Sequence, residues 1–366
     1  MGPLDGIVVA DFSRVLAGPY ATMMLADMGA TVIKVERPEV GDDTRSWGPP
    51  YTEDGTATYF ASVNRNKQSI QLDLRDSDDK NRAYELIERA DILVENFRPG
   101  TMEKLGFGYE TLSKRNPGLI YASLSGFGSG EGADIGGYDL VVQAVGGLMS
   151  ITGSSQEEPV KVGVALVDVL TGLHLGMGVL AALRHRDLID GEKSGQHIQI
   201  NLLSTALSSL VNQASAYINT GTVARPLGNK HPSISPYEVF TTGNGELAVA
   251  AGNDSLFKRF CQAIDREDLA QNPEYATNDA RVARRERLAA EIERTLATNT
   301  SEHWFSNCRE YGVPAGPVND IAQAFKFAEE LGLNPVQNIS GTKVVSNPLN
   351  FSKTPVEYKS GPPPLG

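Results

Sequence analysis

The chain has few of the residues that build disulfide frameworks and metal centres. Its 366 residues include only two cysteines, Cys261 and Cys308, and its five histidines are scattered. Two cysteines are too few for a disulfide framework or a zinc site, and no two-histidine metal motif occurs. We therefore expect no metal site, and a reducing compartment, the cytoplasm, as the location.

Basic charge and long apolar runs are also scarce. The 33 Lys and Arg residues stand against 45 Asp and Glu, giving a formal net charge of -12. This balance argues against a nucleic-acid partner, whose phosphates need a basic face. No apolar run approaches the length of a membrane span, and the amino terminus leads directly into a predicted strand, so we expect no membrane partner and no signal peptide.

What the chain does have is a repeated alternation of short apolar runs and helical segments. The pattern predicts strands at 7–12, 31–36, 68–74, 92–95, 119–124 and 197–200, and helices at 19–29, 80–90, 169–186 and 202–217. Strands that alternate with helices are typical of a parallel sheet. The sequence therefore predicts an α/β fold with a doubly wound, Rossmann-like sheet.

The pattern changes after residue 224. Residues 224–236 are rich in Pro, Gly and Ser, and 237–251 predict a hairpin that turns at Gly243-Asn-Gly245. Charged helical segments follow to about residue 311. We expect a large domain at 1–224, a smaller α+β domain at 225–330, and a C-terminal segment at 331–366 that returns to the large domain.

Basic residues cluster near the predicted carboxyl ends of the strands, where open parallel sheets bind ligands. They are Arg14, Arg37, Arg65, Lys67 and Arg98, in an otherwise acidic chain. This asymmetry favours a small polyanionic ligand. Surface salt bridges are the alternative for Arg37 and Arg98, and a simple turn is the alternative for the glycine-rich loop 125–130.

Asp168 ends an apolar run and precedes a helical segment rich in small residues. Two interpretations are open. Asp is a favoured N-cap residue, because its carboxylate accepts an orphan N–H of the first helical turn. An ionised Asp at the same place is also suited to attack an activated acyl group and form a covalent intermediate.

Motifs along nearly the whole chain resemble those of the class III coenzyme A transferases, a family that also includes the α-methylacyl-CoA racemases. They include Leu25-Ala-Asp-Met-Gly-Ala-Thr-Val-Ile-Lys-Val-Glu36, Gly41-Asp-Asp-Thr-Arg45, Asn64-Arg-Asn-Lys67, Val94-Glu-Asn-Phe-Arg-Pro-Gly100 and Ala144-Val-Gly-Gly-Leu-Met-Ser-Ile-Thr-Gly153. The resemblance implies that Asp168 is the nucleophile. It also implies CoA thioesters as substrates, no tightly bound cofactor, and an interlocked homodimer.

The resemblance further implies a set of CoA contacts. They are Leu16, Ala17, Arg37, Leu72, Arg75, Asn96, Phe97, Arg98, Lys104, Ser125 and Phe127.

Within the family, Arg14-Val-Leu-Ala-Gly-Pro19 and Ser62-Val-Asn-Arg-Asn-Lys67 look most like the branch that transfers CoA between succinyl-CoA and dicarboxylates. On this basis we expect Arg65 to hold the distal carboxylate of the acid, because a guanidinium binds a carboxylate through two parallel hydrogen bonds. Further candidates for substrate binding are Arg14, Arg45, Tyr138 and His231.

Two alternatives remain open, a racemase-type isomerase and a non-catalytic acyl-CoA-binding relative. The racemases carry a catalytic His in a Gly-His-Asp segment, where this chain has Gly137-Tyr138-Asp139. A tyrosine, with an unperturbed pKa of about 10, is a poor second base.

Overall fold

The computed structural model describes residues 1–366 and divides into two compact units. The larger unit comprises Met1–Met149, Lys161–Val223 and Asn334–Gly366, and the smaller unit Ser150–Val160 and Ala224–Leu333. The sequence analysis placed residues 150–160 in the large domain, and the structure corrects this assignment. These residues join the smaller unit, where the N–H of Gly228 donates to the carbonyl of Gly153 at 2.9 Å.

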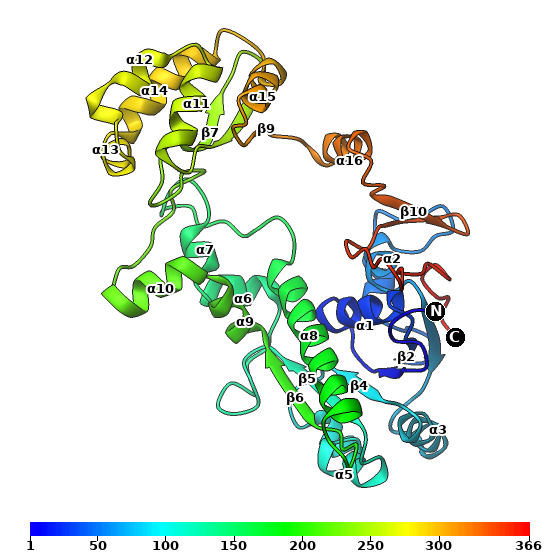
Figure 1. The fold of residues 1–366 in the computed structure, drawn as a ribbon. Coiled ribbons are helices and arrows are strands. Elements are labelled where there is room, and N and C mark those ends of the chain that lie inside the picture. Colours follow the sequence, from blue (N-terminus) through cyan, green and yellow to red (C-terminus); the bar gives the residue numbers. More distant parts are fainter. The chain divides into compact units, whose positions relative to one another are not determined.

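The larger unit is built on a six-stranded sheet in which every neighbouring pair is parallel (Figure 1). In spatial order its strands are β3 (Lys67–Gln71), β2 (Thr31–Glu36), β1 (Val8–Asp11), β4 (Ile92–Glu95), β5 (Ile120–Ser125) and β6 (His197–Asn201). The chain order reverses between β1 and β4. In doubly wound sheets the crevice at such a reversal is the usual ligand site.

Helices cover both faces of this sheet, and side chains alternate between two cores. On β1, Val9 packs in the core that contains α1 (Ala17–Asp27) and α8 (Leu166–Leu188). Its neighbour Ala10 packs in the core that contains α3 (Ser77–Glu88). Because successive strand residues point to opposite faces, strands buried on both faces are nearly continuous apolar runs, which is the pattern that predicted them.

Helix α8 begins three residues before its predicted start and packs closely on α1. Gly172 makes this approach possible, because a Cβ at that position would lie 2.5 Å from the carbonyl oxygen of Ala17. By length and composition alone α8 could cross a membrane, which the sequence analysis did not expect. Its buried residues, including Leu175 and Val179, belong to the core of the larger unit.

Shorter elements complete the larger unit. The helix expected at 202–217 is divided into α9 (Leu202–Ser209) and α10 (Val211–Thr220). The others are η1 (Asp43–Ser46), α2 (Thr58–Val63), α4 (Thr101–Leu105), α5 (Tyr109–Arg115), α6 (Asp139–Val145), α7 (Leu148–Ile151), β10 (Val336–Ile339) and β11 (Thr342–Val345). Helix α7 runs from the larger unit into the first residues of the smaller one.

The smaller unit contains an antiparallel sheet in the order β7 (Tyr237–Thr241), β8 (Glu246–Ala250) and β9 (Ala315–Pro317). The first two strands form the hairpin that the Gly243-Asn-Gly245 turn predicted. Its helices are α11 (Asp254–Ala263), α12 (Glu267–Gln271), η2 (Pro273–Tyr275), α13 (Asn278–Ala283), α14 (Arg285–Leu296), α15 (Ser301–Glu310) and α16 (Ile321–Glu330). They enclose a core of their own, in which both cysteines are buried.

Candidate functional site

Three cavities follow the carboxyl ends of the large parallel sheet. The first, of 620 Å³, lies beyond β2 and β3, and the second, of 320 Å³, lies at the reversal point between β1 and β4. The third, of 540 Å³, lies beyond β4, β5 and β6. Phe97, just after β4, lines all three.

Asp168 lines the second cavity, at the reversal point. It is the third residue of α8, and Ala165 takes the N-cap position, so the interpretation of Asp168 as the N-cap residue is wrong. Burial, and then the nearby Asp139 carboxylate, raise the pKa of Asp168 to about 7. A carboxylate with a raised pKa is a more basic and more nucleophilic group once ionised.

Asp139 closes the amino end of α8 from a neighbouring helix. Its Oδ1 accepts the N–H groups of Val167 at 2.8 Å and Asp168 at 3.2 Å, and its Oδ2 accepts Nε2 of Gln143 at 2.6 Å. This carboxylate therefore satisfies donors of the first turn of α8 and fixes the backbone of Asp168. Sequence reasoning missed Asp139, although it follows Tyr138 in the segment that was compared with the racemases.

The loop after β1 forms another wall of the Asp168 cavity. The Asn96 side chain holds the backbone of Arg14 through two hydrogen bonds. The Arg14 N–H donates to Asn96 Oδ1 at 2.9 Å, and Asn96 Nδ2 donates to the Arg14 carbonyl at 2.8 Å. The Arg14 guanidinium lies over the Phe97 ring and pairs with Asp43 at 3.2 Å. Arg14 thus faces both the Asp168 cavity and the first cavity.

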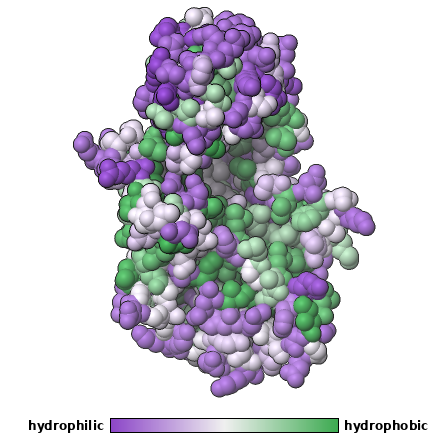
Figure 2. Space-filling model, turned by 60° about the vertical axis from the view of Figure 1, so that its left-hand side comes forward, coloured by the Kyte–Doolittle hydropathy of each residue, from purple (hydrophilic) through white to green (hydrophobic).

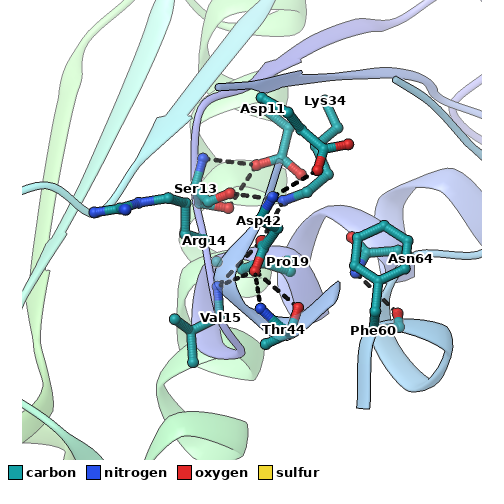
Figure 3. Close-up of polar contacts among 12 residues, drawn as sticks. Asp11, Ser13, Arg14, Val15, Pro19, Lys34, Asp42, Thr44, Phe60 and Asn64 are labelled. Atoms are coloured by element: carbon teal, nitrogen blue, oxygen red, sulfur yellow. Dashed lines mark hydrogen bonds and ion pairs between the residues drawn. The ribbon is translucent and has the colours of Figure 1, made fainter. Parts of the chain in front are cut away.

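A buried network of charges supports this loop (Figure 3). Lys34 pairs with Asp42 at 2.8 Å, and Lys67 pairs with Asp11 at 3.1 Å, with all four side chains fully buried. Burial lowers the pKa of Lys67 to about 8, although the neighbouring Asp11 favours its charged form. Lys67, which the sequence analysis placed among ligand-binding cations, is instead a structural cation.

Most of the predicted CoA contacts lie at the cavities. Leu16, Ala17, Asn96, Phe97, Arg98 and Ser125 line the Asp168 cavity, and Arg37, Leu72 and Arg75 line the first cavity. Lys104 and Phe127 line none of the three, and Phe127 packs against the core.

The structure contradicts the predicted role of Arg65 in substrate binding. Arg65 is 3% exposed, and its guanidinium binds Asp27 through Nε at 2.9 Å and Nη2 at 2.6 Å. It lines no described cavity. The expectation that Arg65 holds a substrate carboxylate is therefore wrong in this structure, because the Asp27 carboxylate already binds its guanidinium group.

The other substrate-binding candidates differ in where they lie. Arg45 is held by Glu36 through both Nε and Nη2 and stacks on the Phe60 ring, so it too is occupied. Tyr138 is exposed and lines the Asp168 cavity. His231 belongs to the smaller unit, where it contacts Ser233 and Tyr237. Arg14 is the candidate arginine left at the Asp168 cavity.

The third cavity contains a second buried carboxyl group that the sequence analysis did not single out. Burial raises the pKa of Glu95 to about 7, and its Oε2 accepts the Phe97 N–H at 2.9 Å. Ser123 and His197, 2.8 Å apart, line the same cavity. No group of three or more His, Cys, Asp or Glu side chains in the chain is arranged to hold a metal ion.

A carboxyl group at the reversal point of a doubly wound sheet, with cations at the neighbouring strand ends, is typical of a site that binds anionic ligands. The chain matches the family model described as CoA-transferase family III over residues 4–366, and it belongs to that family.

Similar proteins agree with this assignment. The chain is 43% identical to the succinate–glutarate CoA-transferase of Agrobacterium fabrum, over 100% of this chain and 93% of the relative. It is 39% identical to the acetyl-CoA:oxalate CoA-transferase of Acetobacter aceti, over 96% of this chain and 90% of the relative. Among solved structures, a CaiB/BaiF family protein from Brucella suis superimposes with a TM-score of 0.88 at 38% identity, covering 100% of this chain and 96% of that one.

Proposed function

We propose that this CoA-transferase moves CoA between succinyl-CoA and a small dicarboxylic acid. The observation that carries the proposal is that Asp168 and Arg14 line the same cavity. The similarity to a relative named for succinate and glutarate supports the choice of acids. The cavity thus offers one group to react with the acyl carbon and another to hold a distal charge.

In the proposed reaction Asp168 carries the acyl group and then the CoA. A carboxylate oxygen of Asp168 attacks the thioester carbonyl. The C–S bond then breaks, so that CoA leaves as a thiolate and an aspartyl–succinyl anhydride remains on the enzyme. The thiolate attacks the aspartyl carbonyl, which releases succinate and leaves an aspartyl-CoA thioester. The acceptor carboxylate attacks this thioester and releases the thiolate again. Attack of the thiolate on the acceptor's acyl carbon yields the new CoA ester and restores Asp168.

We place the nucleotide end of CoA in the first cavity. Arg37 and Arg75 lie on its rim, each beside an aspartate, and apolar side chains including Leu72 and Leu74 form its wall. Guanidinium groups are suited to phosphates, and an apolar wall is suited to a base. The acyl end then extends past Phe97 towards Asp168. Lys104 and Phe127 line none of the three cavities, and their contact with CoA stays a prediction.

We also propose that the protein forms a homodimer. The larger unit exposes apolar side chains on α6, α8 and α10, among them Val145, Met177 and Ile218. Figure 2 shows apolar residues gathered on the surface of this unit. Exposed apolar surface of this kind marks an interaction site.

The substrate assignment can be tested with purified protein, succinyl-CoA and a panel of four- to six-carbon dicarboxylates, with mass spectrometry of the CoA products. We expect CoA esters of one or more dicarboxylates, formed together with free succinate. A chiral 2-methylacyl-CoA incubated in deuterated water should gain no deuterium at its α-carbon. Enzyme-dependent deuterium incorporation, with no CoA transfer to any acid, would favour the isomerase instead.

Arg14→Ala is expected to weaken the use of dicarboxylate acceptors by about one to two orders of magnitude, because a charge-assisted hydrogen bond contributes roughly 1.5–3 kcal/mol. Monocarboxylate acceptors should lose less, and Arg14→Lys should rescue only part of the loss. The measurement is kcat/KM for matched mono- and dicarboxylates. Equal losses for both kinds of acid would assign Arg14 to CoA binding or to the loop.

The acid limb of the pH–rate profile is expected near pH 7. Because the pKa of Asp168 is raised to about 7, the nucleophilic carboxylate is lost as the pH falls through that value. Asp139→Asn removes the neighbouring negative charge but keeps an oxygen for the N–H groups of α8. It should therefore lower the pKa of Asp168 and move the acid limb to lower pH. An unchanged limb in the variant would show that another group controls it.

A further inference from the structure

The segment from Arg14 to Ala17 has an unusual backbone. Val15 has φ of +68°, a left-handed conformation that a β-branched residue rarely adopts because its side chain is crowded there. All four residues of the segment line the Asp168 cavity. Such strain persists only where the surrounding structure enforces it.

Asp42 contacts the backbone N–H of Val15. Its two carboxylate oxygens lie 3.4 and 3.3 Å from the Val15 nitrogen and accept the Val15 N–H. Figure 3 shows Asp42 between this N–H, the Lys34 ammonium and Thr44, while the Arg14 side chain extends away from the pair. Asn96 accepts the Arg14 N–H and donates to the Arg14 carbonyl, so the peptide group between Arg14 and Val15 is held at its carbonyl by Asn96 and at its N–H by Asp42.

The buried surroundings keep Asp42 in place. The side chains of Asp42 and Lys34 are both fully buried, and Lys34 also donates to the Ser13 carbonyl at 2.8 Å. Thr44 donates to Asp42 Oδ1 from its N–H at 2.9 Å and from its hydroxyl at 2.7 Å. Burial alone would raise the pKa of Asp42, but Lys34 and Thr44 hold it below the ordinary value, so Asp42 remains an anionic acceptor.

We propose that the buried Lys34–Asp42 pair is a positioning device that holds Val15 in its left-handed conformation and thereby presents Arg14, Leu16 and Ala17 to the bound CoA thioester. Neither Lys34 nor Asp42 lines the Asp168 cavity, so the pair acts there through the backbone of the loop. Both line the first cavity, where a direct contact with CoA is the alternative that the test must separate. The inference rests on the proposed placement of CoA but not on the identity of the acceptor acid.

The test is a double-mutant cycle in the full-length protein, with the Kd of free CoA measured by calorimetry. Asp42→Asn weakens the acceptor for the Val15 N–H and should raise the Kd about tenfold, since small misplacements of binding groups are costly. Asparagine tolerates the left-handed region, so Val15→Asn needs less help from Asp42. Asp42→Asn should therefore have a clearly smaller effect in the Val15→Asn background.

Asp27→Asn is the matched control. Asp27 is another fully buried aspartate in an ion pair, and it lines no described cavity. This variant should lower the melting temperature, as Asp42→Asn should, but its effect on the Kd should be small and additive with Val15→Asn. If Asp42→Asn does not fold, Lys34→Gln/Asp42→Asn replaces it in the cycle, because that variant leaves no unpaired buried charge.

An unchanged Kd would overturn the proposal and leave Asp42 a structural role. An equal rise in both Val15 backgrounds would also overturn it, and would assign Asp42 to direct contact with CoA in the first cavity. Failure of the dicarboxylate assignment looks different. In that case wild-type protein binds CoA and the cycle shows coupling, but no dicarboxylate receives CoA from succinyl-CoA.

Discussion

Asp168→Asn is expected to abolish CoA transfer, with a loss of at least about a thousandfold in kcat, as for other enzymes that lose their nucleophile. The amide has nearly the same shape as the carboxylate but cannot form the acyl anhydride. The fold should be retained, because Asp139 accepts the backbone N–H groups of Val167 and Asp168 at this end of α8, and neither bond uses the Asp168 side chain. Circular dichroism and CoA binding serve as controls for folding.

The positive test of the same prediction is a trapped intermediate. Wild-type protein incubated with succinyl-CoA and then hydroxylamine should carry a hydroxamate at Asp168, which peptide mass spectrometry locates. The Asn variant should carry none. Wild-type turnover by a variant that mass spectrometry shows has not deamidated to Asp would contradict the mechanism.

Arg65→Met is expected to destabilise the protein by about 3–5 kcal/mol, because it leaves the Asp27 carboxylate buried without its partner. Both side chains are almost fully buried, and their two hydrogen bonds form a bidentate pair. Asn66 and Asn347 donate to the same carboxylate, so the loss also disturbs contacts with the C-terminal segment. Denaturant unfolding monitored by circular dichroism measures the effect.

Two further variants distinguish stability from substrate binding. Arg65→Met/Asp27→Leu removes both charges and should recover most of the stability. Arg82→Ala, at an exposed arginine paired with Asp79, should change stability by less than about 1 kcal/mol. The folded Arg65→Met protein should keep the wild-type ratio of di- to monocarboxylate use. A selective loss of dicarboxylate use would return Arg65 to the substrate site.

The parallel sheet could be predicted because its signal is local. The predicted ranges of β2 and β4 coincide with the structure, since each is a short apolar run with clear boundaries. The break between α9 and α10 was missed because it depends on one residue, Val211, whose φ is +40°. The return of residues 150–160 to the smaller unit depends on tertiary contacts, which no local pattern reports.

The site was only partly predictable for a similar reason. From the sequence alone, Arg14 and Arg65 are equally good candidates for a ligand-binding arginine, since each lies within a few residues of a predicted strand. Arg14 follows one strand and Arg65 precedes another. Only the fold shows that Arg65 lies against Asp27, which is 38 residues away in the chain. The local pattern singled out Asp168, and the family resemblance chose the nucleophile's role for it. The capping role of Asp139 required the geometry of two helices whose ends meet.

One carboxylate, that of Asp43, pairs with two arginines beside the cavities. Asp43 pairs with Arg14 at 3.2 Å and with Arg37 at 2.6 Å, and all three side chains are partly exposed. In the absence of substrate the two guanidinium groups thus share a single internal counter-ion. We therefore expect a phosphate or carboxylate that binds either arginine to compete with Asp43. A ligand with two separated negative charges should compete best, because it can contact both arginines at once.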